Sequence, residues 1–391
     1  MKRIPMKSNV NIPVIDHYIV AANRYLFSLP FGKFCLFIYA FVFIQNGVWS
    51  VPNVETVRKM SQHLTENVLT PDIQYLYSSF FGLFLGYVTG ASKSHNAFLG
   101  IHLLSLTIGF FVLAYQIRKK YSDDLARIVI LAFAAVPLCN VLTTWLGTSD
   151  VFVYIFGTAL TIVGQPLLAL LFSFLLGLSH FEQSCFIVLI LVFWRTVLID
   201  SLEVTRGKTI LICLSMISGV FLAKLSLTSY FSLLDFNLVS NRISFAREFP
   251  LKTFMDNYFR IAGVTLFSFQ NVFWIFVLAL CLEAWKNYLR FFICIIATHA
   301  LLMTVSMIVL DTTRNFTLMA WPSIILMCII AEKKVLLPMD DMKSLITTVF
   351  LLNLIIPKLI VWEGKIHSSV SYFNFLKIFK CFNVNVLTPF R

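Results

Sequence analysis

Long apolar runs alternate with short polar turns along most of the chain, and this pattern predicts a bundle of transmembrane helices. A helix that crosses the hydrocarbon core of a bilayer needs roughly 20 apolar residues. Runs at 151–163 and 167–178 are short at about 1.5 Å per residue, so we expect them to lie inside the bundle. In all we expect about eleven spans, at residues 34–49, 97–117, 128–144, 151–163, 167–178, 185–198, 210–223, 261–282, 291–310, 316–331 and 345–361.

Residues 73–90 are also apolar, and the orientation of everything after them depends on whether they cross. The next apolar run ends in the basic triplet 118–120, and basic residues favour the cytoplasmic side of a membrane. Residues 73–90 also contain glycines, which are poor residues in the interior of a helix. We therefore expect a membrane-surface helix that does not span, which places the basic triplet in the cytoplasm.

The polar stretches lie outside a single transmembrane domain, 1–391, of the all-α polytopic class. Residues 1–32 are basic and predict a cytoplasmic N-terminal segment. Residues 51–96 predict a first external loop with interfacial helices, and 224–260 a second long external loop. Residues 362–391 predict an external C-terminal tail.

The composition excludes a soluble protein. Hydrophobic residues make up 59% of the chain and charged residues only 13%, whereas a soluble domain carries about 25% charged residues. In this setting the net charge of +12 indicates topology and attraction to anionic lipid rather than nucleic-acid binding. The cysteines form no CxxC motif or Cys/His cluster, so neither a disulfide frame nor a zinc site is supported. The first apolar run has no small-residue cleavage site, so we expect an anchor rather than a signal peptide.

The expected orientation collects the conspicuous polar turns on the external face. Acids near hydrocarbon are costly and often mark a hydrated functional cavity, so their convergence on one face favours a functional site. The candidate residues are the possible catalytic acids Glu55, Asp72 and Asp150 and the possible substrate- or phosphate-binding residues His180, Glu182, Gln183, Arg242, Arg247, Arg260, Asp311 and Arg314.

Each of these turns also has a simpler interpretation. Thr148, Ser149 and Asp150 fit the N-cap of a helix, and Asp311 with Arg314 fits a local i, i+3 pair. A histidine in a turn is more often a hydrogen-bonded residue than a metal ligand. Both interpretations stay open at the level of the sequence.

Acids and basic residues together at a membrane surface suggest transfer from a lipid-linked donor. A carboxylate can act as general base on an acceptor hydroxyl, and Glu55 or Asp150 is the candidate. Arginines can neutralise a phosphate or diphosphate leaving group. The carboxylates could also hold Mg²⁺ or Mn²⁺, although no ligand spacing specifies a metal site.

This layout resembles the GT-C superfamily of membrane glycosyltransferases over most of the chain. The likeness lies in a cytoplasmic N-terminus, one span, a large external loop with an early acid, and a second acid at a short external turn. It implies a polyprenyl-linked sugar donor, an acceptor on the external side, and catalytic roles for Glu55 in the first loop and for Asp150. The first loop has a lone Glu55 where the family often has paired acids, which leaves the base open between Glu55 and Asp72.

Two other functions fit the same pattern. An O-antigen type polymerase would also use an undecaprenyl-diphosphate glycan and would rely on the basic external loop and Arg314. A transporter or flippase is a third possibility, although the two halves of the chain contain no matched broken helices. The compact loops and the polyprenyl donor favour a bacterial plasma membrane.

Overall fold

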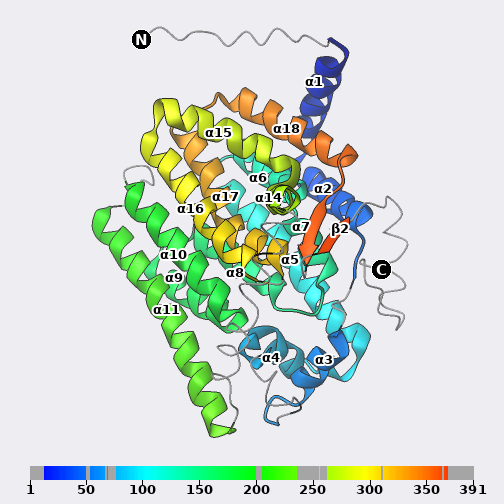
Figure 1. Ribbon diagram of the computed structural model, residues 1–391, viewed down its shortest axis with the longest axis vertical. Helices are drawn as coiled ribbons and strands as arrows, with labels where there is room; N and C mark the ends of the chain where they lie inside the picture. The colour runs from blue at the N-terminus through cyan, green and yellow to red at the C-terminus, as the bar shows by residue number, and fades with distance from the viewer. Residues whose placement is uncertain are drawn as a thin grey trace.

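The computed structural model describes residues 13–49, 53–66, 68, 76–199, 205–235, 255, 262–309, 311–362 and 365–368. Nearly all of these residues lie in helices that pack into one bundle (Figure 1). The helices are α1 Pro13–Ser28, α2 Phe31–Asn46, α3 Val54–Gln62, α4 Phe80–Val88, α5 His95–Lys120, α6 Asp123–Ala135, α7 Leu138–Thr144, α8 Asp150–Ile162, α9 Pro166–Ser179, α10 Phe181–Val197, α11 Arg206–Leu233, α14 Ala262–Gln270, α15 Trp274–Asn287, α16 Leu289–Met307, α17 Thr312–Lys333 and α18 Met339–Ile355. A two-stranded antiparallel sheet, β1 Leu359–Trp362 and β2 Lys365–Ser368, follows α18.

The helices have the length and composition of a multi-pass membrane protein. Within the described residues five segments are long and apolar enough to cross a bilayer, namely α5, α11, α14 with α15, α16 and α17. A sixth forms if the bent pair α6 and α7 counts as one span, and α2, α8 and α9 are shorter apolar helices. The general class predicted from the sequence is therefore confirmed, while helix length alone does not give eleven crossings.

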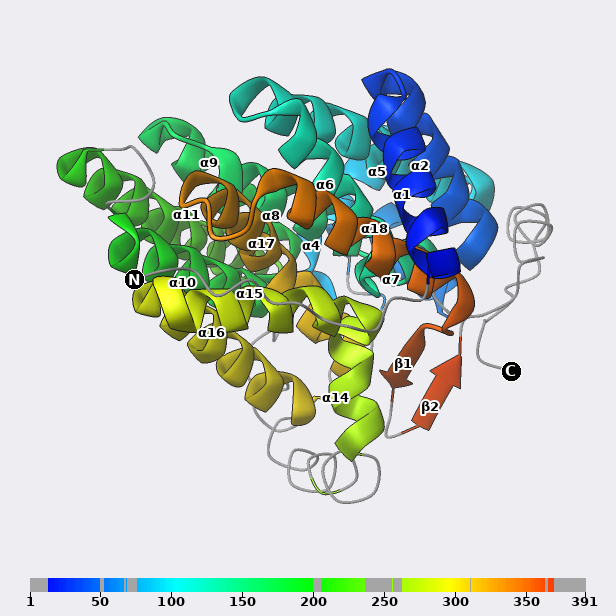
Figure 2. The same cartoon turned by 90° about the horizontal axis from the view of Figure 1, so that it is seen from above.

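Helix α17 runs through the centre of the bundle (Figure 2). It packs against α6, α7, α8, α10, α14 and α16, and 89% of its most apolar stretch is buried, against 39% in α11 and α16. This burial explains why α17 is apolar on all sides over most of its length. Side chains in its first turn are consequently held in a fixed place.

The predicted span at 128–144 is broken in the middle. Helix α6 ends at Ala135, and after Val136 and Pro137 the chain continues as α7 at an angle of 61° to α6. Proline lacks the backbone N–H that would continue the helical hydrogen bonds, and it disfavours helical geometry in the residue before it. Nearly every side chain of both helices is buried, so the break lies inside the protein.

Helices α9 and α11 approach each other closely through small residues. A Cβ atom at Gly219 would lie 2.0 Å from Ser173 Oγ, and one at Gly177 would lie 2.6 Å from Ala223 Cβ. Such contacts let helix backbones pack tightly in a membrane, where apolar burial between helices contributes little. This packing explains how the short helix α9 is held against the bundle.

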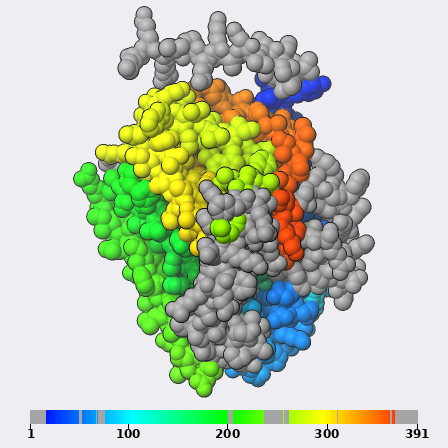
Figure 3. All heavy atoms as spheres, in the orientation of Figure 1, coloured from blue at the N-terminus to red at the C-terminus, as the bar shows by residue number. Residues whose placement is uncertain are grey.

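The first loop folds into short helices at one end of the bundle. In Figure 3 these residues, in blue, lie at the same end as the last turns of α11, in light green. A small cluster of apolar side chains joins them, including Met60, Tyr77 and Leu83 from the loop and Leu227 and Phe231 from α11. Helix α4 has 9 residues, or about 13 Å, which is shorter than the roughly 20 residues of a typical span. Whether residues 73–90 cross the membrane stays a prediction.

Two predicted boundaries are wrong. Helix α11 continues to Leu233, so residues 224–233 are not part of the predicted loop, because Leu227 and Phe231 pack against the first loop. The predicted last span, 345–361, ends early, because Pro357 disfavours helical geometry at Ile356, which is extended. Residues 359–362 form strand β1 instead.

Candidate functional site

A cavity of about 420 Å³ opens between the first loop and the bundle. One side is formed by α3 and by the segment from Leu76 to α4, and the other by the α7–α8 turn and the first turn of α17. The side chains on which its chemistry depends are Trp145, Ser149, His180, Asp311, Arg314 and Trp362. Elements far apart in the sequence therefore meet at one site.

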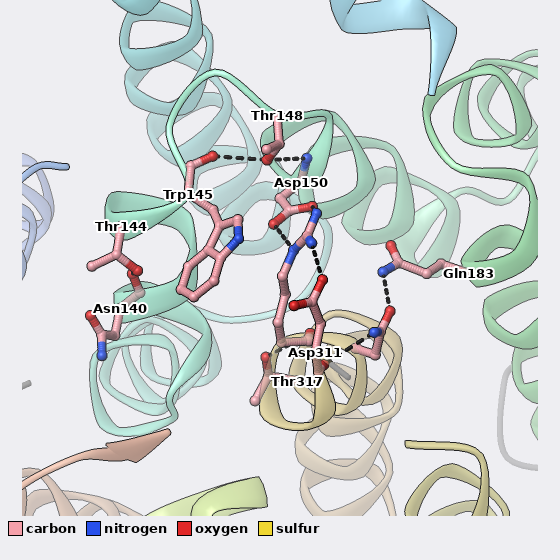
Figure 4. A network of polar contacts seen from close by, with 10 residues as sticks. Asn140, Thr144, Trp145, Thr148, Asp150, Gln183, Asp311 and Thr317 are labelled. Carbon is pink, nitrogen blue, oxygen red and sulfur yellow. Dashed lines mark hydrogen bonds and ion pairs between the residues drawn. The ribbon is translucent and has the colours of Figure 1, made fainter. Parts of the chain in front are cut away.

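One residue that lines the cavity, Arg314, is held between the carboxylates of Asp150 and Asp311, and Figure 4 shows these polar contacts. Arg314 donates from Nε to Asp150 Oδ2 at 2.7 Å and from Nη2 to Asp150 Oδ1 at 2.8 Å. It also donates from Nη1 to Asp311 Oδ2 at 2.5 Å. The pair with Asp150 is bidentate, which is the strongest geometry for arginine and carboxylate, and it ties α17 to the start of α8.

Helix ends place the three charges. Asp150 is the first residue of α8 and Asp311 is the N-cap residue of α17, where the helix dipole favours negative charge. Arg314 lies in the first turn of α17, so Asp311 and Arg314 do form the local pair anticipated from the sequence. Arg314 also bonds to Asp150, which lies 164 positions away in the sequence. The interpretation as a local i, i+3 pair does not include this contact.

A glycine makes the turn before Asp150 possible. Gly147 has a φ of +100°, a conformation that side chains other than glycine rarely adopt. A Cβ atom there would also lie 2.9 Å from Val54 Cγ2 of α3. The absence of a side chain at Gly147 thus leaves room for α3 to pack against this turn.

The two carboxylates differ in what they can do. Asp150 is fully buried and both of its oxygens accept from Arg314, so it has no oxygen available to a substrate. The Asp311 side chain is 27% exposed, lines the cavity, and accepts from Arg314 through Oδ2 only. Arg314, Asp150 and Asp311 form a charged triad whose formal charge sums to −1. Asp311 is the acid of this triad that is accessible from the cavity.

Two tryptophans form an aromatic corner in the wall of the cavity. Trp145 follows α7 and Trp362 ends β1, and their rings meet edge to face with centroids 6.0 Å apart. The guanidinium of Arg314 lies 5.9 Å from the centre of the Trp145 ring. The two rings offer a large apolar surface in the cavity wall beside the cation of Arg314.

The predicted turn at 180–183 contributes His180 to the lining of the cavity. His180 is the N-cap residue of α10 and accepts from the Gln183 backbone N–H at 3.5 Å, which supports the interpretation as a turn residue. The Glu182 carboxylate, 42% exposed, lies 3.4 Å from His180 Nδ1. Gln183 donates from Nε2 to Asn315 Oδ1 at 2.6 Å, so it supports α17 from behind rather than lining the cavity.

The structure does not bring Glu55 to the cavity. Its side chain is 49% exposed and bonds to Arg58 Nε at 2.8 Å and His95 Nδ1 at 2.5 Å. Partial burial tends to raise the pKa of this carboxyl, but the hydrogen bonds from Arg58 and His95 outweigh it, so the pKa lies below its usual value. Glu55 therefore fastens α3 to the start of α5.

Four predicted site residues, Asp72, Arg242, Arg247 and Arg260, lie outside the described residues. Among the residues that are described, no group of three or more His, Cys, Asp or Glu side chains lies close enough together to hold a metal ion.

An apolar groove of about 380 Å³ lies on the other face of α4. Ser79, Gly82 and Leu83 line the cavity, whereas Phe80 and Phe84, one helical turn apart, line the groove. The groove continues along α9 and α11 through Phe174, Leu178 and Tyr230. Helix α4 therefore separates a polar cavity from an apolar groove.

The tryptophans and the groove were missed from the sequence. Trp145 lies five residues before Asp150 in a stretch already singled out for its turn, and that proximity was the available signal. Trp362 was missed because the sequence predicted a transmembrane span that ended at residue 361 and an external tail that started at residue 362.

Comparison with known proteins leaves the geometry as the only basis for assigning a function. A scan against protein-family models gives no match, and no curated protein and no solved structure matches the chain.

Proposed function

We propose that this protein is a membrane glycosyltransferase that moves a sugar from a polyprenyl-phosphate or diphosphate donor to a glycan or lipid-linked acceptor. The observation that carries the proposal is the cavity with an accessible carboxylate beside an apolar groove. The proposed reaction takes place on the extracytoplasmic face of a bacterial plasma membrane, in the synthesis of cell-surface polysaccharide. The proposed topology keeps the N-terminus in the cytoplasm and about eleven crossings, with the short helices α8 to α10 crossing within the bundle.

Asp311 is the proposed general base. Its Oδ1 makes no hydrogen bond within the described residues, while Oδ2 is held by Arg314, which fixes the direction of the free oxygen. A positioned carboxylate that takes a proton from an attacking hydroxyl contributes roughly 10²–10⁴ in rate. This role moves the base from Glu55 or Asp150, which the sequence suggested, to Asp311.

The aromatic corner is the proposed site for the sugar ring. A pyranose presents a face of C–H groups and an edge of hydroxyls, and tryptophan offers a large apolar face for the former. Ser149 and His180 line the same cavity and offer polar atoms for the hydroxyls. The cavity of about 420 Å³ falls within the usual range for small-molecule sites, about 300–1,000 Å³.

The apolar groove is the proposed site for the first units of the polyprenyl chain. Its lining is almost entirely aromatic and aliphatic, with Thr65 and Ser226 as the polar exceptions. Such a lining matches the hydrocarbon character of a polyprenyl chain.

The charge of the leaving phosphate needs cations beyond the triad. Arg314 is already paired with two carboxylates, so it cannot neutralise a diphosphate by itself. The proposed sources are Arg242, Arg247 and Arg260 of the second long loop or a bound Mg²⁺ or Mn²⁺ ion.

The test is the replacement of Asp311 by asparagine in the full-length protein, followed by measurement of surface glycan in cells that lack the native copy. We expect loss of at least about 100-fold in transfer, with normal insertion in the membrane. The matched control is Asp340→Asn on α18, an acid whose side chain is 95% exposed. Full transfer by Asp311→Asn contradicts the proposal, and loss of long chains with single repeat units retained indicates a polymerase instead.

One observation favours transport as a second candidate. Discontinuous helices often surround the binding sites of transporters, and the α6–α7 break carries buried polar side chains, Asn140 among them. Purified protein in vesicles separates the two. Movement of a labelled lipid-linked sugar across the bilayer by Asp311→Asn, without transfer, would favour transport.

A further inference from the structure

A lysine lies deep in the bundle at the break between α6 and α7. Lys358 is 1% exposed, and its Nζ donates to the Ala134 carbonyl at 2.9 Å and to Cys139 Sγ at 2.8 Å. Ionisable side chains in the interior of a membrane protein are costly and mark a function by default. The proposed transfer reaction does not use this residue.

The break supplies both of these partners of Lys358. The last carbonyl groups of a helix have no partner within it and carry partial negative charge, and Ala134 lies at this end of α6. Asn353 of α18 donates to the same carbonyl at 3.1 Å. Gln45 of α2 donates from Nε2 to the Asn353 carbonyl at 2.8 Å, so three elements besides α6 meet here.

The same lysine leads directly into strand β1. The Leu359 N–H donates to Asn271 Oδ1 at 2.9 Å, and Asn271 Nδ2 donates back to the Leu359 carbonyl at 3.4 Å. The Val361 N–H donates to Thr313 Oγ1 of α17 at 2.9 Å. These bonds fix the backbone from residue 358 to the end of β1, where Trp362 meets Trp145.

Both tryptophans of the aromatic corner lie on segments that contact the α6–α7 break. Cys139 lies on α7, and Trp145 follows the end of that helix. Lys358 lies four residues before Trp362. The contact between Lys358 and the break thus links the two segments that carry the tryptophans.

We propose that Lys358 is a positioning residue that joins the start of β1 to the α6–α7 break and thereby sets the geometry of the Trp145–Trp362 corner. What the corner binds rests on the proposed function; the coupling between Lys358 and the tryptophans does not. A lysine that only filled space would be replaceable by methionine without loss, because apolar residues of similar volume are often as stable as buried charged groups.

The experiment measures the accessibility of Trp362 in the purified full-length protein in detergent. Quenching of tryptophan emission by acrylamide is recorded in each variant with Trp362 and with Trp362→Phe, and the difference isolates that ring. We expect Lys358→Met to increase quenching of Trp362 about twofold, as local opening of the hairpin exposes it. Lys358→Arg, which keeps a donor, should return quenching toward the wild-type value.

The matched control is Arg195→Met, another buried cation that donates to the carbonyls at a helix end, at 3.0 Å from Nη2 to the Thr161 oxygen. It should leave Trp362 quenching unchanged. If Lys358→Met fails to fold, Thr313→Val removes the acceptor for the Val361 N–H with little change in volume and should expose Trp362 in the same direction.

Unchanged quenching in Lys358→Met, or an equal rise in Arg195→Met, overturns the proposal. Because the readout needs no substrate, it stands apart from the transferase test. A protein without transferase activity that shows the expected quenching supports the coupling alone.

Discussion

The two ends of helix α8 each meet an arginine, and the contrast between them separates a helix cap from the proposed site. At the N-terminal end Arg314 binds the carboxylate of Asp150. At the C-terminal end Arg195 Nη2 donates to the carbonyls of Leu160, Thr161 and Val163 at 3.3, 3.0 and 3.0 Å. The Asp150 carboxylate at the N-terminal end and the Arg195 guanidinium at the C-terminal end both complement the helix dipole. Among the described residues, carboxylates are part of the arrangement at the N-terminal end alone.

Cationic side chains cap the C-terminal end. Lys120 Nζ also donates to the Ile162 carbonyl there, so the carbonyl groups at this helix end accept from a lysine and an arginine of the same chain. The N-terminal end borders the cavity and has an additional carboxylate, Asp311, one oxygen of which makes no hydrogen bond to the residues that the structure describes. An arginine is thus a helix cap at one end of α8 and part of the proposed site at the other, where an additional acid borders the cavity.

The largest expected effect comes from removing each arginine in turn. Arg314→Met leaves Asp150 buried without a partner, and breaking a buried ion pair in this way costs about 3–5 kcal/mol. Arg195→Met loses a helix-end cation, worth up to about 2 kcal/mol. Unfolding in mixed detergent micelles measures the free energy of unfolding of both variants, and equal losses would contradict the distinction between pair and cap.

The second prediction separates the two acids of the triad. Asp150→Asn should lower the free energy of unfolding by about 3 kcal/mol because Arg314 loses its fully buried partner. Asp311→Asn should cost about 1 kcal/mol or less, because Asp311 is partly exposed and Arg314 keeps Asp150.

The control for this prediction is the double variant Asp150→Asn with Arg314→Met. Residues in direct contact do not contribute additively to stability, so the double variant should be less destabilised than the sum of the two single variants. Additive losses would mean that the pair contributes little and that both residues act through other contacts.

The sequence indicated much of this site but not its pairing. The period and length of the apolar runs predicted most of the helices, and the turns at Asp150, His180 and Asp311 were predicted to share a face; all three residues belong to the triad or the cavity lining. No local pattern shows that Arg314 bonds to an acid 164 positions away, because that contact depends on how α8 and α17 pack.

The sequence misjudged positions where the tertiary structure overrides a local pattern. Residues 359–362 are apolar enough to extend a span, yet pairing with β2 and bonds to Asn271 and Thr313 hold them as a strand. Glu55 follows the first span closely, as a catalytic acid would, but which face of α3 it occupies is decided by packing. Asp72 and the basic residues of the second long loop stay predictions.

The smallest expected effect concerns Glu55, whose charges face water rather than the protein interior. Its folded pKa lies below the usual value of 4.5, because hydrogen bonds from Arg58 and His95 outweigh the effect of partial burial. A lowered pKa means that the contribution to stability is present above 4.5 and is lost as the pH falls through the folded pKa. Since the side chain is 49% exposed, the contribution should be under about 1 kcal/mol and smaller in high salt.

The measurement compares the thermal midpoints of wild type and Glu55→Gln across the acidic range. The two curves should differ slightly near neutral pH and converge once the pH falls below the folded pKa, where the carboxyl is protonated in both states of the wild type. Glycan transfer by Glu55→Gln should equal that of wild type. Loss of transfer with an unchanged thermal midpoint would restore the hypothesis of a first-loop base and move the site from the end of α8 to the surface of α3.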